Sequence, residues 1–215
     1  AIKRGTPVPA DAIAEYLWPE QSPELTTHRL EVVVSTLRRI VDYRNNSRSW
    51  QFIHNDRGSY RLEISTACQV DVDEYHQLLS RVKYLKTEGK SEESLVLYQE
   101  LDNLYRGDLF EDEPYAEWCW MERETLRETH LDILRQMAMI LVQKGDLESA
   151  IQYYRKALRF DPLREELHRQ LIHTLLKAGR KDEAQRQYLY CCDVLKRELG
   201  ITPSVETEAL NKILS

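Results

Sequence analysis

A pattern of residues recurs at an offset of 34 positions in the second half of the chain. The matching pairs are Gly145 and Gly179, Ala150 and Ala184, and Tyr154 and Tyr188. Apolar residues lie at helical spacing on both sides of each glycine, so each unit predicts two antiparallel helices with a small residue where they cross. Because one such unit cannot bury its apolar face alone, about three stacked units are expected. The repeat therefore constrains this half of the chain to a stack of helix pairs.

Residues 131–162 resemble a tetratricopeptide repeat. The positions that the family usually keeps carry Leu134, Met137, Ala138, Leu141, Gly145, Ala150, Tyr154, Ala157 and Pro162. Leu134 is an aliphatic residue at a position where the family often has Trp. The next unit keeps the pattern but has Lys196 where the proline falls, so its last helix is expected to continue to about Glu198.

A first, degenerate unit is predicted upstream of these two. At an offset of 56 residues, the matching pairs are Gly89 and Gly145, Tyr98 and Tyr154, and Leu101 and Ala157. The larger offset is explained by extra residues, YRGDLFEDEPYAEWCWMER, inserted at 105–123. Residues 71–215 would then hold the three units that a stable stack requires.

The first part of the chain reads as helix, turn and helix. Pro9 followed by ADAIAEYL predicts a short helix that ends at Trp18-Pro19, since the residue before a proline avoids the helical region. QSPEL is expected to form a turn. Thr26 and Thr27 are candidate caps for a second helix over residues 26–43.

The second helix is predicted to be amphipathic. Its apolar stripe comprises Leu30, Val34, Leu37 and Val41. At 100° per residue, the opposite face carries His28, Val32, Ser35, Thr36 and Arg39, with Arg29 and Arg38 on the flanks. This helix thus buries one side and presents polar and basic side chains on the other.

From Trp50 the apolar period changes to two, which predicts a β-hairpin. The alternating apolar residues are Trp50, Phe52, Tyr60, Leu62 and Ile64. NDRG between the two runs supplies a turn, with Gly58 where a positive φ is expected. Helix, turn, helix and hairpin is the order of a winged helix, in which the second helix enters the major groove and the hairpin contacts the DNA backbone or minor groove.

The net charge of −6 is unevenly distributed. Residues 1–64 hold nine Lys/Arg and eight Asp/Glu, whereas residues 65–215 hold 21 and 28. Residues 26–61 contain seven arginines and three acidic residues, which gives this segment a local charge of +4. Local charge, rather than the total, decides whether a surface attracts phosphate, so the first part remains a candidate for nucleic-acid binding.

Several motifs in order resemble the bacterial transcriptional activator domain, which occurs behind an OmpR-like winged helix in antibiotic-regulatory activators. They are EYLWPE, STLRRIV, GSYRLE, VDVDEYHQLL, LYRGDLF, WCWMERETLRE, PLREELHRQLIHTLLKAGRKDEAQRQY and ELGITPSVET. The resemblance implies a mostly α fold: a partial winged helix-turn-helix with one β-hairpin over residues 1–66, then a tetratricopeptide-like α-helical repeat domain over residues 67–215. It also implies that the chain is a fragment of a longer regulator, because the family's winged helix begins with strands and a first helix upstream.

The predicted function is that of a DNA-binding transcriptional regulator, and the resemblance implies an activator. The candidate contacts to double-stranded promoter DNA are His28, Arg29, Ser35, Thr36, Arg38, Arg39, Arg44, Arg48 and Arg57. Thr36 and Arg39 are expected at base edges, and Arg44, Arg48 and Arg57 at phosphates. The repeat domain would bind proteins, with RNA polymerase, further domains of the same regulator or a second copy as candidates.

Two other functions stay open. The chain could be an interaction scaffold that does not bind DNA, or a repeat module that senses a ligand. An enzyme is not expected, because no phosphate-cradling loop, G-x-S-x-G, H-E-x-x-H or Cys/His constellation occurs. No cofactor, metal or membrane partner is expected either, since the longest apolar run is Met137–Val142 and no leader opens the chain. A cytoplasmic protein follows from these expectations.

The remaining residues that could carry chemistry have structural explanations. Trp118 and Trp120 cannot share one helix face, so one is expected to pack under the repeats and the other to close the connection to the winged helix. His168 and His173 lie five apart without an acidic partner at ligand spacing and are expected to be surface or hydrogen-bonded histidines. The four cysteines, Cys68, Cys119, Cys191 and Cys192, are expected to be reduced thiols.

Overall fold

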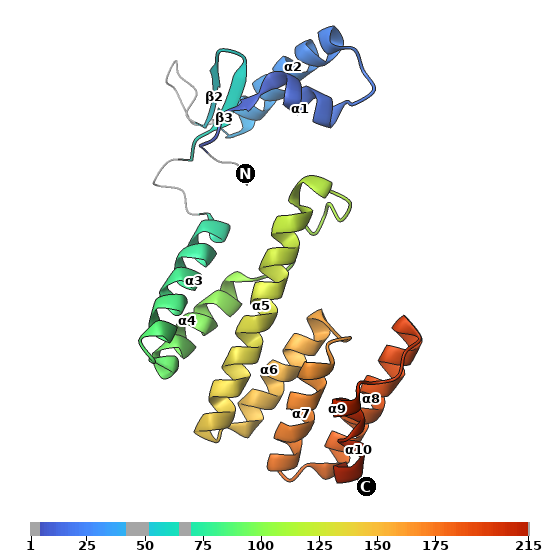
Figure 1. Ribbon diagram of the computed structural model, residues 1–215. Helices are drawn as coiled ribbons and strands as arrows, with labels where there is room; N and C mark the ends of the chain where they lie inside the picture. Colours follow the sequence, from blue (N-terminus) through green and yellow to red (C-terminus); the bar gives the residue numbers. More distant parts are fainter. Residues whose placement is uncertain (1–4, 42–51, 65–69, 215) are drawn as a thin grey trace. The chain divides into compact units, whose positions relative to one another are not determined.

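The computed structural model describes residues 5–41, 52–64 and 70–214 (Figure 1). The chain divides into two compact units, Ala1–Val70 and Asp71–Ser215. Each unit has its own hydrophobic core, and each is described separately below.

Unit 1 contains two helices and a small antiparallel sheet. Its elements are β1 (Val8–Pro9), α1 (Ala10–Leu17), α2 (Pro23–Val41), β2 (Ile53–Asp56) and β3 (Ser59–Leu62). The predicted short helix and hairpin are both present. β1 pairs with β3 and makes the sheet three-stranded, in the order β1-β3-β2. The sequence did not predict β1, because a strand of two residues is too short to show a period.

α2 begins at Pro23, three residues before the predicted start. Proline suits the first position of a helix, since its missing N–H would have no partner there. Thr26 is therefore not a cap: its buried hydroxyl donates to the carbonyl of Pro23 at 3.0 Å. The prediction of a non-helical turn over QSPEL was wrong in its second half.

The core of unit 1 consists of Ala14, Leu30 and Val34, with Trp18 and Ile53 packed against it. The prediction that the whole stripe of α2 faces inward was wrong, because Leu37 and Val41 are exposed in the part of the chain that the structure describes. α1 has 8 residues and α2 has 19, so α1 spans about 12 Å against about 28 Å for α2. α1 is too short to cover the last turns of α2.

The hairpin turn of unit 1 consists of Arg57 and Gly58. Their φ angles are 49° and 81°, and positive φ at both central residues is typical of a type I′ turn, which matches the twist of the two strands. The positive φ predicted for Gly58 is confirmed. The turn sets the register of β2 and β3, in which Asp56 faces Ser59 and Ile53 faces Leu62.

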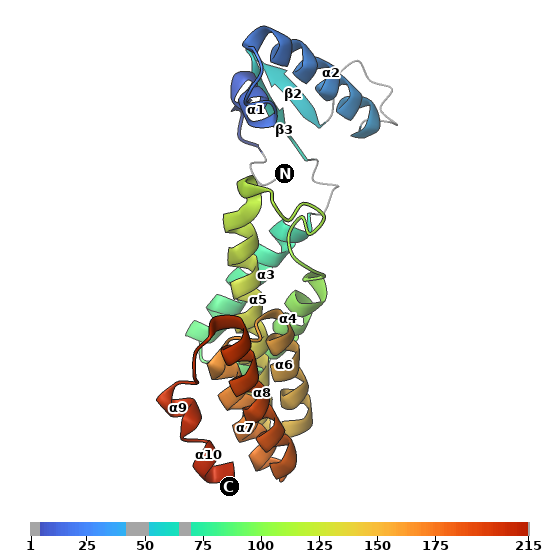
Figure 2. The same ribbon diagram turned by 90° about the vertical axis from the view of Figure 1, so that its right-hand side faces the viewer.

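Unit 2 is a stack of three helix pairs (Figure 2). The pairs are α3 (Asp71–Thr87) with α4 (Ser91–Leu104), α5 (Glu117–Lys144) with α6 (Leu147–Phe160), and α7 (Glu165–Lys177) with α8 (Lys181–Leu199). The short helices α9 (Val205–Glu208) and α10 (Asn211–Leu214) follow, and α10 contacts α8. α8 ends one residue beyond the predicted Glu198.

The predicted repeat register is confirmed in all three pairs. Gly89, Gly145 and Gly179 each have a positive φ and follow the first helix of a pair. Five residues after each glycine stand Ser94, Ala150 and Ala184, and twelve residues after stand Leu101, Ala157 and Cys191; all six are fully buried. In the first unit Ser94 takes the place of alanine, and its hydroxyl donates to the carbonyl of Lys90 at 3.2 Å.

The insertion forms a loop over residues 105–116 and the first turns of α5. Arg123 holds the loop by donating to the carbonyls of four loop residues, Leu109, Phe110, Glu113 and Pro114, at 2.7 to 3.0 Å. The expectation that one tryptophan packs under the repeats was wrong: Cys119 is the buried residue, and Trp118 and Trp120 are exposed on either side of it.

A polar cluster is enclosed between the first two helix pairs. The ring of His130 is buried, stacks on Tyr105 at 4.0 Å between centroids and meets the edge of Phe160. Asp102 Oδ1 accepts from Lys156 Nζ at 2.6 Å, whereas it lies 3.5 Å from His130 Nε2 without a hydrogen bond. Burial outweighs the carboxylate and lowers the pKa of His130 to about 4. This histidine is therefore neutral near pH 7.

Replacing Ala150 by Leu should destabilise unit 2. The added side chain has no space at the crossing of α5 and α6, and overpacking of this kind costs about 1 to 3 kcal/mol. Thermal unfolding followed by circular dichroism measures the effect. Gln152→Leu, at an exposed position of the same helix, is the control and should leave the midpoint nearly unchanged. Equal midpoints for both variants would contradict the repeat register.

Unfolding of unit 2 should become easier as the pH falls from about 6.5 to about 4. His130 has a lower pKa folded than unfolded, so the unfolded chain binds the proton first across this window. The contribution is at most about 1.4 kcal/mol per pH unit. Urea unfolding of His130→Phe, which keeps an aromatic ring, should show a shallower decline than the unaltered chain. His173→Phe, at an exposed position of α7, is the control; parallel curves for all three proteins would refute the prediction.

Candidate nucleic-acid interface

The exposed face of α2 carries the predicted polar residues. His28, Ser35, Thr36 and Arg39 are exposed, while Leu30 and Val34 on the opposite side are buried in the core of unit 1. Core packing therefore determines which way this face points. His28 Nδ1 lies 3.8 Å from Glu31 Oε2, a separation at which a protonated ring and the carboxylate attract each other weakly.

Two of the predicted arginines are engaged within unit 1. Arg29 donates to the side-chain carbonyl of Gln21, and its guanidinium lies 5.4 Å from the ring centroid of Trp18. Arg38 Nε donates to the carbonyl of Ile53 at 3.0 Å and so ties α2 to β2. Both side chains stabilise the arrangement of the helices and the sheet.

Two other predicted arginines have no ion pair within the described residues. Arg39 Nη2 lies 3.4 Å from the hydroxyl of Thr36, which itself donates to the carbonyl of Val32. Arg57 projects from the hairpin turn. Arg44 and Arg48 lie outside the described residues. Sequence reasoning could not separate the engaged arginines from the others, because all of them carry the same charge at helical or turn positions.

The chemistry of this surface suits a polyanion. A guanidinium offers forked donors that match phosphate oxygens and the O6 and N7 edge of guanine, and hydroxyls reach either base edges or phosphates. Glu24 and Glu31 are the opposing charges on the same helix. An exposed helix face with Thr36 and Arg39, followed by a hairpin with a cation at its turn, has the parts that winged-helix proteins use on duplex DNA.

The part of the chain that the structure describes contains no cluster of three or more His, Cys, Asp or Glu that could hold a metal ion. Cys119, Cys191 and Cys192 are free thiols, and Cys68 lies outside the described residues. Buried His168 is hydrogen-bonded at both nitrogens, to the carbonyl of Pro162 at 2.9 Å and to the amide of Gln187 at 2.7 Å. In the described helices, no stretch is both long and apolar enough to cross a membrane.

The fold places the helix, helix and hairpin order of a winged helix before a stack of helix pairs in the chain. Residues 70–214 match the bacterial transcriptional activator domain, and the chain belongs to this family. Its role is transcription regulation, as the resemblance predicted.

Curated relatives cover nearly the whole chain. Regulatory protein DnrI of Streptomyces peucetius is 23% identical over 214 residues, which are 98% of this chain and 78% of DnrI. Transcriptional regulatory protein MoaR1 of Mycobacterium tuberculosis (strain ATCC 25618 / H37Rv) is 25% identical over 218 residues, 99% of this chain and 68% of MoaR1. Both relatives extend beyond the region that they share with this chain.

A solved structure has a similar fold. Mycobacterium tuberculosis EmbR, in complex with a low affinity phosphopeptide, superposes with a TM-score of 0.74 at 22% identity. The match covers 98% of this chain and 55% of the EmbR chain, so this chain spans about half the length of that protein.

Arg38 and Arg39 are neighbours in the sequence and allow a direct test of which arginines stabilise unit 1. Arg38→Ala should lower the stability of unit 1 by about 1 kcal/mol, because it removes the donor to the Ile53 carbonyl. Arg39→Ala should leave stability nearly unchanged, since its guanidinium contacts only Thr36 at 3.4 Å. Hydrogen exchange of the β2 and β3 amides reports on this unit specifically. Equal protection in the two variants would contradict the assignment.

Proposed function

We propose that unit 1 binds double-stranded promoter DNA, with α2 in the major groove and the β2–β3 hairpin against the backbone. The single observation that carries the proposal is the exposed face of α2, where Arg39 and Thr36 lie opposite a buried apolar face and no carboxylate pairs with Arg39 in the described residues. The order of elements in unit 1 and the family of unit 2 support it.

The proposed contacts divide by chemistry. Arg39 and Thr36 read base edges, with His28 and Ser35 beside them on the same face. Arg57, at the hairpin turn, binds a phosphate. Arg44 and Arg48 are proposed to bind phosphates through their charge. Arg29 and Arg38 hold α2 in place through their internal contacts, and their positive charge attracts the DNA backbone toward this helix.

We further propose that the protein acts in the cytoplasm as an activator without enzymatic activity. The relatives are regulatory proteins, which supports this role. The stacked helix pairs of unit 2 would contact proteins, with RNA polymerase, other domains of the regulator or a second copy as candidates. A second copy would allow paired half-sites on the DNA and so raise affinity.

Salt titration of DNA binding tests the proposal. Arg57→Asn removes the cation but suits the positive φ of the turn, so the fold of the hairpin is kept. If Arg57 neutralises one phosphate, the slope of log affinity against log salt should flatten by about 0.9. Fluorescence anisotropy on a labelled duplex of random sequence measures it. Arg57→Lys retains the charge and should keep the slope.

A second variant, Arg39→Ala, tests whether α2 reads the base sequence. Arg39→Ala should weaken binding to a duplex selected from a randomised pool by about 1 to 3 kcal/mol and relax the preference at one base position. Binding of random duplexes should fall less. Absence of salt-dependent binding by the unaltered chain, or identical titrations for the Arg39 and Arg57 variants and the unaltered chain, would favour the scaffold without DNA binding.

A further inference from the structure

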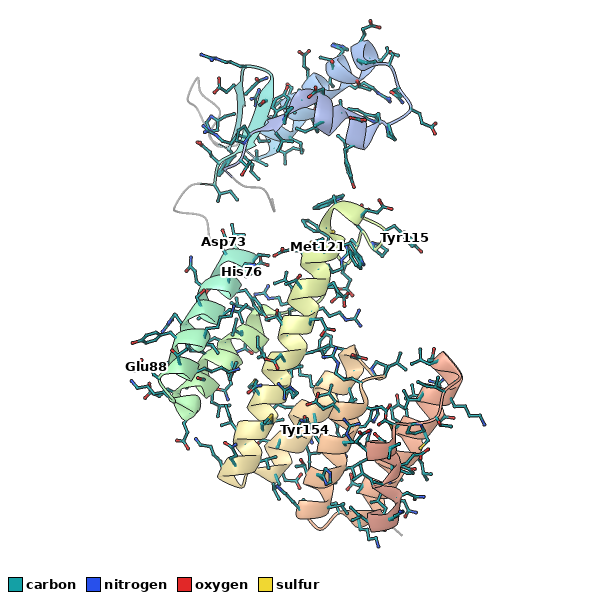
Figure 3. The ribbon with its side chains drawn as sticks, in the orientation of Figure 1. Asp73, His76, Glu88, Tyr115, Met121 and Tyr154 are labelled. Atoms are coloured by element: carbon teal, nitrogen blue, oxygen red, sulfur yellow. The ribbon has the colours of Figure 1, made fainter. Side chains whose placement is uncertain are left out.

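An aromatic patch lies at the N-terminal end of α5, outside the stacked faces of the helix pairs (Figure 3). It consists of Phe110, Tyr115, Trp118, Trp120 and Met121, whose exposed fractions are 38%, 94%, 46%, 61% and 75%. Large apolar side chains gathered in this way mark interaction sites more often than single exposed ones do. The DNA interface proposed above does not use any of these residues.

The backbone forces these side chains outward. Successive residues of a helix are about 100° apart, and Cys119 is buried against the inserted loop, where its thiol donates to the carbonyl of Ala116 at 3.3 Å. Trp118, Trp120 and Met121 are therefore distributed over the arc that faces away from Cys119. The two tryptophans lie on either side of this arc, with Met121 between them.

The patch is also held in shape before any partner binds. Arg123 satisfies four carbonyls of the preceding loop, including that of Phe110. The ring of Phe110 meets Trp118 edge to face, with 4.8 Å between centroids. A surface that is ordered in advance loses less conformational entropy on binding.

Acidic side chains beside the patch are exposed and can pair with a cationic partner. Glu111, Asp112, Glu113 and Glu117 are exposed and form no ion pair within the described residues. A second copy docked through the same patch would place these carboxylates against their equivalents, which is unfavourable. An anionic lipid surface would be repelled in the same way. A cationic protein segment is the occupant that the charges favour.

We propose that the aromatic patch docks a basic amphipathic segment of a partner protein. The proposal deepens, and rests on, the protein-binding role proposed for unit 2, and it does not depend on DNA binding. Apolar side chains of the segment pack on Trp120 and Met121, and an arginine stacks on an exposed ring. The surrounding carboxylates pair with further Lys or Arg residues. Trp, Tyr and Arg are the residues that dominate binding energy at protein interfaces.

The test uses the whole chain and a Trp-free helical peptide with Leu on one face and Arg on the other. Binding is followed by tryptophan fluorescence and by calorimetry. The unaltered chain is expected to bind this peptide, and binding should weaken with salt. Matched peptides with Glu in place of Arg, or with Gln in place of Leu, should bind at least about tenfold more weakly.

Variants locate the site. Trp120→Ala and Met121→Ala should each weaken peptide binding by about tenfold, as should the double change Glu113→Gln with Glu117→Gln. Tyr84→Ala on α3 and Leu189→Ala on α8 also remove exposed large side chains and serve as controls, with Glu88→Gln as the charge control; these should bind as the unaltered chain does.

Several results would overturn the proposal. One is equal weakening by the control variants, because the peptide would then bind elsewhere on unit 2. Another is a self-associating chain that Trp120→Ala makes monomeric in sedimentation, which would identify a second copy as the occupant. Tryptophans already shielded from acrylamide in the free chain would show that the patch is covered. If no peptide binds while the salt dependence of DNA binding persists, the docking proposal fails and the DNA proposal stands.

Discussion

Close crossing of paired helices is the constraint on which unit 2 depends. The second helix of each pair can approach the first only where its side chain is small, and Ser94, Ala150 and Ala184 occupy this position, fully buried. The glycine five residues earlier ends the first helix with a positive φ and so reverses the chain at the right place. Dispersion contacts and buried apolar area then accumulate along the stack, because each pair covers the apolar face of the next.

The repeat was predictable because its constraints are local and repeated. Each repeat needs a glycine with positive φ and a buried small residue at a fixed spacing from it, so both residues recur in the sequence of every repeat. The first unit was harder to recognise because the insertion changes the offset to 56 residues and because Ser94 replaces alanine, with its hydroxyl satisfied on the preceding turn. By contrast, β1 exists only through pairing with Tyr60 and Ser59, which are some fifty residues away, so a two-residue strand leaves no local signal.

The candidate DNA interface was predictable as a face but not as a set of free cations. Helical period alone placed Thr36 and Arg39 opposite Leu30 and Val34, and the structure agrees. Which arginine forms hydrogen bonds within unit 1 depends on its neighbours in the tertiary structure. Arg38 reaches a carbonyl fifteen residues away on β2, a contact that no spacing rule contains. The same holds for Arg123, whose role as the anchor of the inserted loop follows only from where the four carbonyls lie.

Interruption of the repeat explains why a candidate docking surface arises at residues 105–121. In a regular stack, each apolar residue of a helix is covered either by its own pair or by the next one. The inserted loop and the first turns of α5 have no counterpart in the other two helix pairs, so no neighbouring helix pair covers Trp120 and Met121. Their exposure therefore does not follow from imperfect packing of the stack. Arg123 fixes the loop that carries Phe110, so the inserted segment is itself ordered. Its exposed side chains can therefore serve a role that the repeat pattern does not determine.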